Sequence, residues 1–144
     1  MTTVLDACAV IALLRGEPAA EPVRQLIGAG DATLTVLAQA EVLDQLARVV
    51  GVGEEEAVLT LAQLGLPIPA PVPAAIGLRA GLLRSRHYHR TDRAVSLADC
   101  AGAEVARALG ARLATADAHL LDLCRDEGIA TAPLPNSSGI AWAG

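Results

Sequence analysis

The chain opens with Thr2-Thr3-Val4-Leu5-Asp6 and runs on without a break into the mainly apolar residues 7–14. Thr, Val and Leu favour the pleated backbone of a sheet, so residues 2–6 are predicted to form a buried strand that ends in a carboxylate. The apolar spacing of residues 7–14 favours a helix packed back on that sheet. Ligands of open α/β sheets bind at the carboxyl ends of the strands, which makes Asp6 the first candidate functional residue.

The composition is that of a globular domain with an aliphatic core. A length of 144 residues suits one domain, and we expect residues 1–144 to form one. Hydrophobic residues make up 53% of the chain and aromatic residues only 1%, so the core has to consist of Ala, Val, Leu and Ile. The three cysteines form no CxxC pair, which argues against a disulfide framework or a zinc site and favours a reducing, cytoplasmic setting. We expect no signal peptide, because the N-terminus lacks a basic region and has Asp6 where the apolar region of such a peptide would lie. We expect no membrane span, because prolines interrupt the longest uncharged run.

Candidate strands and helices alternate along the rest of the sequence. Strands are predicted at 32–36, 66–72, 111–115 and 129–132, and helices over about 19–27, 37–50, 74–86, 96–109 and 118–127, with a further helix that starts at the acidic residues 54–56. Such alternation implies a parallel sheet covered on both faces. We therefore expect an α/β protein, a three-layer α/β/α sandwich around a mostly parallel sheet of four or five strands.

Two of these segments allow a more detailed prediction. Prolines alternate at positions 67, 69, 71 and 73, so the missing N–H groups of residues 66–72 would lie along one edge, as in an edge strand protected against pairing. In the helix over 37–50, the spacing predicts one shared apolar face made of Val36, Ala40, Leu43, Ala47 and Val50.

Four acidic residues, Glu21, Asp44, Glu104 and Asp122, stand three or four positions before an arginine and are expected to form solvated helix pairs. Four carboxylates that lack such a neighbour are Asp6, Glu41, Asp99 and Asp117. Taken singly, each has an ordinary structural explanation. Asp99 follows Ser96 at the spacing of a capping box, and Asp117 precedes a helix that it could cap. Glu41 could face solvent, and Asp6 could be a turn residue.

Taken together, the four carboxylates indicate a metal site. Asp6 and Asp117 follow strands of the predicted parallel sheet, and Glu41 and Asp99 lie in the first turns of helices that leave the same edge. Carboxylates that converge there repel each other unless a hard divalent cation with oxygen ligands lies among them, which describes Mg²⁺ or Mn²⁺. Such an ion activates water and stabilises in-line displacement at a phosphoryl group.

The basic residues are concentrated in one segment. The formal net charge is −5, but all 11 basic residues are arginine and five of them fall between positions 79 and 93. We interpret this segment as a surface that binds phosphates beside the metal site, with Tyr88 available to stack on a base. The candidate RNA-binding residues are Arg84, Arg86, Arg90 and Arg93. For any one of these arginines, a solvated helix end or loop is an equally good explanation.

The chain resembles the PIN-domain ribonucleases, above all the VapC toxins of bacterial type II toxin–antitoxin pairs. Four motifs carry the resemblance, in the family's order and over nearly the whole chain: Val4-Leu5-Asp6-Ala7-Cys8-Ala9, Ala40-Glu41-Val42, Ser96-Leu97-Ala98-Asp99-Cys100 and Ala114-Thr115-Ala116-Asp117. The resemblance implies a PIN-like fold. It also implies a Mg²⁺-dependent endoribonuclease toxin that cleaves single-stranded RNA, with Mn²⁺ as a substitute ion.

The resemblance also implies roles for particular residues. Asp6, Asp99 and Asp117 would bind the metal ion, and Glu41 would complete the cluster or position water. Ser96 and Thr115 would orient the neighbouring acids. A homodimer and inhibition by a VapB-like antitoxin are implied as well.

The chain departs from the family directly after the first aspartate, where the family usually has small hydroxyl residues and this chain has Ala7 and Cys8. The change could loosen the support of Asp6. It favours an alternative function, a non-catalytic PIN-like module that binds RNA or a protein. Phosphohydrolases of the haloacid-dehalogenase type and phospho-accepting receiver domains also begin with a strand and an aspartate. Both rely on a lysine, and this chain has none.

Overall fold

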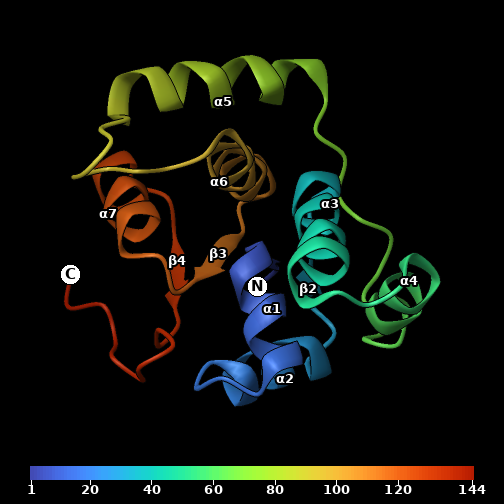
Figure 1. The fold of residues 1–144 in the computed structure, drawn as a ribbon. Coiled ribbons are helices and arrows are strands. Elements are labelled where there is room, and N and C mark those ends of the chain that lie inside the picture. Colours follow the sequence, from blue (N-terminus) through green and yellow to red (C-terminus); the bar gives the residue numbers. More distant parts are fainter.

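Four parallel strands form the central sheet of the computed structural model, which describes residues 1–144 (Figure 1). The strands are β1 (Thr3–Leu5), β2 (Ala32–Thr33), β3 (Arg112–Thr115) and β4 (Thr131–Pro133), and they lie in the order β2-β1-β3-β4. Thr3 of β1 pairs with Ala32 on one side and with Arg112 on the other. The first strand of the chain therefore lies in the middle of the sheet, directly beside β3.

Helices cover both faces of this sheet. They are α1 (Ala7–Arg15), α2 (Ala20–Gly28), α3 (Val36–Asp44), α4 (Glu54–Ala62), α5 (Ala74–His87), α6 (Leu97–Leu109) and α7 (Ala118–Glu127), and a π-helical turn, Gln45–Val50, extends α3. One core lies under α5, α6 and α7, and a second lies under α1 to α4. Val4 points into the first core and Leu5 into the second, because successive side chains of a strand face opposite ways. The predicted α/β sandwich around a parallel sheet is confirmed.

Polar caps determine where four of the helices begin. Asp6 caps α1, Thr35 caps α3, Ser96 caps α6 and Asp117 caps α7, and each side chain accepts a hydrogen bond from a backbone N–H of the first turn. The caps of α1, α3 and α7 come just after the carboxyl ends of β1, β2 and β3. Because the strands are parallel, these helix starts gather at one edge of the sheet, and that edge carries the candidate site.

The prediction of an edge strand over residues 66–72 is wrong. This segment makes a single bridge to the chain beyond β2, in which Ala70 N donates to Leu34 O at 2.7 Å and Val36 N donates to Ala70 O at 3.0 Å. The neighbouring chain turns into α3 at Thr35, so no extended backbone continues there to pair with the rest of the segment. For the same reason β2 ends at Thr33, whereas the sequence predicted a strand that continues to Val36.

The apolar face that the spacing predicts in the helix over 37–50 is not the face that α3 buries in the core. Val36 and Val50 are exposed, and the side chains that enter the core are Ala38, Val42 and Leu46. The same 3–4 spacing holds on both faces, so the sequence pattern could not choose between them. The cap made the difference, because the buried Thr35 places Ala38 and Val42 against the sheet.

The structure also bears on the cysteines and on the apolar run. All three cysteines are free thiols; Cys100 and Cys124 are buried and Cys8 is half-buried. None of the helices has the length and apolar composition that crossing a membrane requires.

Candidate active site

Asp6 and Asp117 lie side by side at the carboxyl edge of the sheet. Asp6 follows β1, Asp117 follows β3, and the two strands are neighbours. Asp99 lies in the first turn of α6, and Glu41 lies in α3. The negative charge of Asp6 raises the pKa of both Glu41 and Asp99, and Asp117 has the same effect on Asp6 and Asp99. The structure thus brings all four predicted carboxylates within electrostatic reach of one another.

The hydroxyl group of Thr115 joins the two strand ends. Its Oγ1 donates a hydrogen bond to Asp6 Oδ2 at 2.8 Å and accepts one from Asp117 N at 3.1 Å. Thr115 is fully buried, so this bridge is shielded from water. Thr115 therefore contacts the backbone of the acid next to it and the side chain of the acid across the sheet.

Asp6 is held at both carboxylate oxygens. Oδ1 accepts a hydrogen bond from Ala7 N at 2.9 Å, and Oδ2 accepts one from Cys8 Sγ at 3.1 Å in addition to that from Thr115. Cys8 thus donates to the carboxylate that its presence was expected to leave poorly supported. Sequence reasoning missed this contact, although Cys8 lies two residues after an aspartate, where local side-chain hydrogen bonds are frequent.

Asp99 and Asp117 combine a capping role with an open carboxylate oxygen. Asp99 and Ser96 form a capping box, in which Ser96 N donates to Asp99 Oδ2 at 2.8 Å and Asp99 N donates to Ser96 Oγ at 3.0 Å. Asp117 Oδ1 accepts a hydrogen bond from His119 N at 2.9 Å. These bonds occupy one oxygen of each residue and leave Asp99 Oδ1 and Asp117 Oδ2 open.

Burial and mutual repulsion make it costly for these acids to ionise. Burial is the larger cause of the raised pKa of Asp6, Glu41 and Asp99, and the neighbouring carboxylates add to it. For Asp99 the two effects bring the pKa to about 7. None of the four carboxylates forms an ion pair with an arginine, and the arginines that do form ion pairs have other acids as partners. The edge of the sheet therefore lacks a positive charge of its own.

The donor set suits a hard divalent cation. Carboxylate oxygens are its preferred ligands, and a buried group of acids without a basic partner gains stability when such an ion neutralises it. As the side chains stand, no group of three or more His, Cys, Asp or Glu residues is arranged to hold a metal ion. The fit therefore rests on the chemistry of the donors and on the oxygens that remain open.

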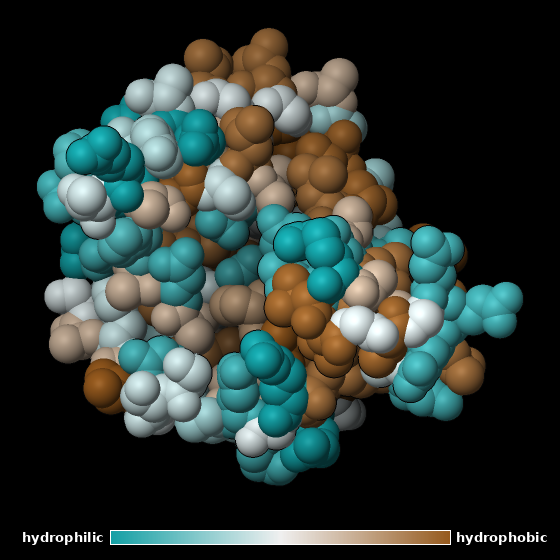
Figure 2. All heavy atoms as spheres, viewed as in Figure 1, coloured by the Kyte–Doolittle hydropathy of each residue, from teal (hydrophilic) through white to brown (hydrophobic).

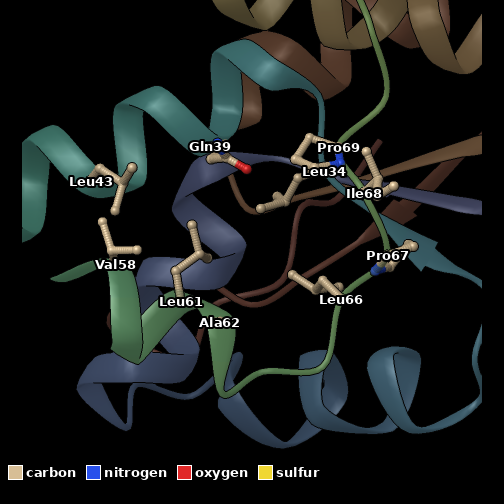
Figure 3. A pocket seen from close by; sticks show the side chains of 10 residues that line it. All are labelled: Leu34, Gln39, Leu43, Val58, Leu61, Ala62, Leu66, Pro67, Ile68 and Pro69. Carbon is tan, nitrogen blue, oxygen red and sulfur yellow. The ribbon is translucent and has the colours of Figure 1, made fainter. Parts of the chain in front are cut away.

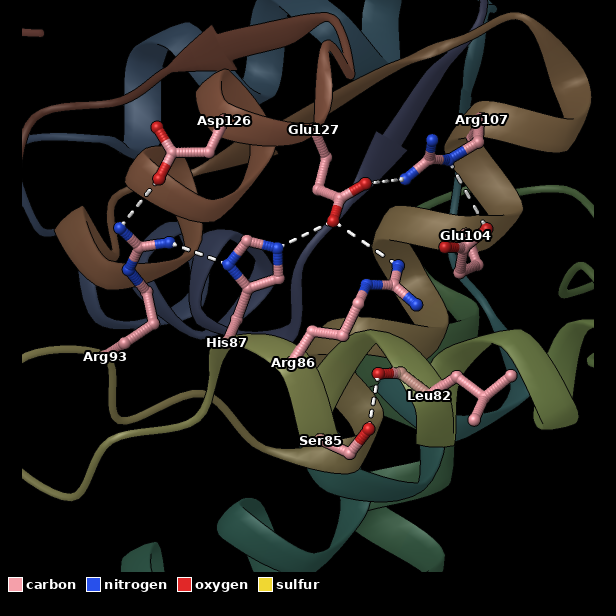
Figure 4. A network of polar contacts seen from close by, with 9 residues as sticks. All are labelled: Leu82, Ser85, Arg86, His87, Arg93, Glu104, Arg107, Asp126 and Glu127. Carbon is pink, nitrogen blue, oxygen red and sulfur yellow. Dashed lines mark hydrogen bonds and ion pairs between the residues drawn. The ribbon is translucent and has the colours of Figure 1, made fainter.

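Arg86 and Arg93, two of the predicted RNA-binding arginines, are engaged in an ion-pair network at the other end of α7 (Figure 4). Glu127 accepts from His87 at 2.6 Å, from Arg107 at 3.0 Å and from Arg86 at 3.4 Å. Arg93 donates to Asp126 at 2.9 Å. The hydrogen bonds from His87, Arg107 and Arg86 hold the pKa of Glu127 down to about 2. The network ties the end of α5 to the ends of α6 and α7.

The other two predicted RNA-binding arginines differ in exposure. Arg84 Nε donates to Val95 O at 2.9 Å, and its guanidinium lies 4.1 Å from the centre of the Tyr88 ring. Arg90 is exposed and forms no ion pair. The segment that carries Arg90 is anchored beside the acids, because Ala94 N donates to Nδ1 of His119 at 2.8 Å in the first turn of α7. Sequence reasoning gave His119 no role.

An apolar hollow of about 380 Å³ lies between α3, α4 and the proline-rich segment (Figure 3). Gln39 and Leu43 of α3 face Val58 and Leu61 of α4 across it, and Leu66 to Pro69 form a third wall. Ile68 is 92% exposed. In Figure 2, apolar atoms gather on the side of the molecule that carries α3, whereas the side that carries α7 is mostly hydrophilic.

The model of the PIN domain family matches residues 3–126 of this chain. PIN domains are generally nucleases, so the match supports a nuclease role. The four acidic motifs lie within the matched residues. No curated protein sequence matches the chain.

Several solved structures share the fold. The structure of VapBC2 from Rickettsia felis bound to a promoter DNA fragment aligns with a TM-score of 0.66. The sequence identity is 17%, and the alignment covers 92% of this chain and 98% of that chain. FitAcB from Neisseria gonorrhoeae aligns with a TM-score of 0.63 at 18% sequence identity, over 90% of this chain and 96% of that chain. A toxin–antitoxin complex from Klebsiella pneumoniae aligns with a TM-score of 0.59 at 17% sequence identity, over 81% of this chain and 87% of that chain. At these identities the likeness establishes the fold.

Proposed function

This chain belongs to the PIN domain family, and on that premise we propose that it is a Mg²⁺-dependent endoribonuclease, the toxin of a type II toxin–antitoxin pair. One observation carries the proposal. Four carboxylates gather at the carboxyl edge of the sheet without an arginine partner, and burial together with neighbouring negative charges raises the pKa of three of them, Asp6, Glu41 and Asp99. A binding module would gain nothing from such repulsion. A site for a divalent cation requires carboxylate ligands, and the bound ion relieves the repulsion between them.

Asp6, Asp99 and Asp117 would hold the cation, which when bound supplies an activated water and stabilises the displacement at phosphorus. Asp99 Oδ1 and Asp117 Oδ2 accept no hydrogen bond and Asp6 Oδ1 accepts only that of Ala7 N, so these three oxygens are available for the cation. Ser96 and Thr115 fix the opposite oxygens of Asp99 and Asp6 through hydrogen bonds, so the open oxygens stay oriented toward the site.

Glu41 is suited to handle the proton of the attacking water. It accepts no hydrogen bond from the protein, and burial together with the charges of Asp6 and Asp44 raises its pKa. A carboxylate with a raised pKa is a better proton acceptor near neutral pH. Attack by water leaves a 5′-phosphate and a 3′-hydroxyl on the two RNA fragments.

Arg90 and Tyr88 are the side chains best placed to contact the RNA outside the acidic site. Arg90 is exposed without an acidic partner, and Tyr88 is 47% exposed beside Arg84. An exposed guanidinium binds backbone phosphates, and an exposed aromatic ring stacks on a base without demanding a particular sequence. Arg84, Arg86 and Arg93 mainly support the segment that presents these two residues.

The antitoxin would occupy the apolar hollow between α3 and α4. An antitoxin segment that fills this hollow lies on the helix that carries Glu41, so a basic residue of the same segment could neutralise the acids. Ile68 offers a test because it is almost fully exposed. Ile68→Asp should leave the fold intact and abolish copurification with a coexpressed VapB-like antitoxin. Undiminished copurification would place the antitoxin elsewhere. A homodimer is also expected, and the molecular mass in solution checks it.

The nuclease proposal is tested on a defined 5′-labelled single-stranded RNA and on its DNA counterpart. We expect cleavage of the RNA with Mg²⁺ or Mn²⁺, none with EDTA, and fragments that end in a 5′-phosphate and a 3′-hydroxyl. Fragments with a 2′,3′-cyclic phosphate would overturn the hydrolytic mechanism. Cleavage of the DNA but not of the RNA would overturn the assignment of RNA as the substrate.

A further inference from the structure

Asp6 accepts more hydrogen bonds than any other carboxylate of the site. Thr115 Oγ1 and Cys8 Sγ both donate to Oδ2, at 2.8 and 3.1 Å, and Ala7 N donates to Oδ1 at 2.9 Å. Cys8 Sγ also lies 3.5 Å from Thr115 Oγ1. The thiol, the hydroxyl and one carboxylate oxygen therefore form a tight triangle beneath the site.

The distances in this triangle favour one arrangement of its protons. Thr115 has a single hydroxyl proton, which it donates to Asp6, and its oxygen already accepts the N–H of Asp117. The thiol proton of Cys8 then goes to Asp6 Oδ2 at 3.1 Å, because Thr115 Oγ1 lies farther from the sulfur, at 3.5 Å. An ionised carboxylate oxygen has about two acceptor positions, so Oδ2 is fully occupied. Oδ1 has one position taken by Ala7 N and one position open.

We propose that Cys8 is a positioning residue, whose thiol acts with Thr115 to occupy Asp6 Oδ2 so that Asp6 offers a divalent cation only Oδ1. The inference rests on the proposed function, because it concerns the same site. It gives Cys8 a role where the family usually has a hydroxyl residue. A thiol is a weaker donor than a hydroxyl group, so a serine at this position should perform the same task at least as well.

The other thiols of the chain provide a control. Cys124 is fully buried in the core under α5, α6 and α7 and forms no hydrogen bond with a carboxylate. Cys124→Ala therefore removes a thiol that is more deeply buried than Cys8, without touching Asp6. A loss of Mn²⁺ affinity that occurs in Cys8→Ala and not in Cys124→Ala cannot then be attributed to the removal of a sulfur atom as such.

The test is the affinity of the metal-free chain for Mn²⁺, measured by electron paramagnetic resonance of the free ion. Loss of the hydrogen bond in Cys8→Ala should weaken Mn²⁺ binding about tenfold, as substitution of residues that orient metal ligands generally does. Cys8→Ser should restore the wild-type affinity to within about twofold, and Cys124→Ala should equal the wild type. Circular dichroism of each variant verifies that it folds.

The outcomes separate the inference from the function on which it rests. Wild-type affinity in Cys8→Ala, with Mn²⁺ bound by the wild type, would overturn the positioning role and leave the nuclease proposal intact. A tenfold loss in Cys8→Ser as large as that in Cys8→Ala would also overturn it. No Mn²⁺ binding by the folded wild type would overturn both.

Discussion

Thr115 Oγ1 lies 2.8 Å from Asp6 Oδ2, so one buried hydroxyl group connects the two strand ends on which the site is built. Thr115→Val keeps the shape and removes the hydrogen bonds to Asp6 and Asp117. Two buried polar groups then lose a partner, which should lower the free energy of unfolding by about 1–3 kcal/mol. RNA cleavage should fall at least about tenfold, because Asp6 is no longer oriented. Urea unfolding and cleavage rates check the two effects, and Thr115→Ser should restore both.

Asp99→Asn should stabilise the metal-free protein while abolishing cleavage. The amide oxygen of asparagine can still accept the Ser96 N–H, and the charge that is costly beside Asp6 and Asp117 is removed. At pH 8 in EDTA, we expect a gain on the order of 1–3 kcal/mol in the free energy of unfolding. Asp31→Asn, at an exposed site outside the acidic group, is the matched control and should change neither property. A destabilised Asp99→Asn protein would show that the acids do not repel each other.

The metal-free protein should lose stability as the pH rises through the acidic and neutral range. The pKa of Asp99 is raised from 3.8 to about 7, and those of Asp6 and Glu41 are raised as well. The folded state then keeps protons that the unfolded chain has released, so the free energy of unfolding falls as the pH rises from about 4 to about 7. Above that range the loss is complete. Saturating Mg²⁺ should reverse it, because the ion binds only the folded state.

Glu127 has the opposite effect at lower pH, since His87 and the arginines hold its pKa at about 2. The stability it contributes is present above pH 4.5 and is lost as the pH falls toward 2. Urea unfolding in EDTA should therefore show a maximum near pH 4 to 5. Stability that increases steadily from pH 4.5 to 8 would contradict the account of the acidic site.

Arg90 and Arg93 should respond differently to substitution by alanine. Arg90 is exposed and unpaired, so Arg90→Ala should weaken RNA binding and reduce the salt dependence of binding by about 0.7 in the log–log slope, with the melting temperature unchanged. Arg93 pairs with Asp126 and contacts His87, so Arg93→Ala should lower the melting temperature. Binding titrations at several salt concentrations measure the first effect and thermal unfolding the second. Equal salt slopes for wild type and Arg90→Ala would remove Arg90 from the RNA surface.

The starts of the helices could be predicted because they depend on neighbouring residues. Ser96 and Asp99 form the capping box that their spacing predicts, and Asp117 caps α7. The same local signals placed Asp6 at the end of β1. These structural roles and the proposed metal binding are compatible, because each cap uses only one carboxylate oxygen of Asp99 and Asp117.

Other features depend on contacts between distant parts of the chain and could not be predicted. Residues 66–72 had the pattern of an edge strand, but pairing needs an extended neighbour, and the chain bends into α3 at Thr35. Arg86 and Arg93 stood in an arginine-rich segment, but their partners Glu127 and Asp126 lie more than 30 positions further along. Only the packing of α5 and α7 brings these pairs together.

The decisive experiment for the nuclease activity is cleavage of total RNA by the purified chain with Mg²⁺, with EDTA and the Asp99→Asn variant as parallel samples. Because Asp99→Asn should be folded and more stable, its inactivity cannot be ascribed to unfolding. We expect discrete RNA fragments only from the wild type with Mg²⁺. Equal cleavage by Asp99→Asn, or no cleavage by folded wild type free of antitoxin, would contradict this expectation.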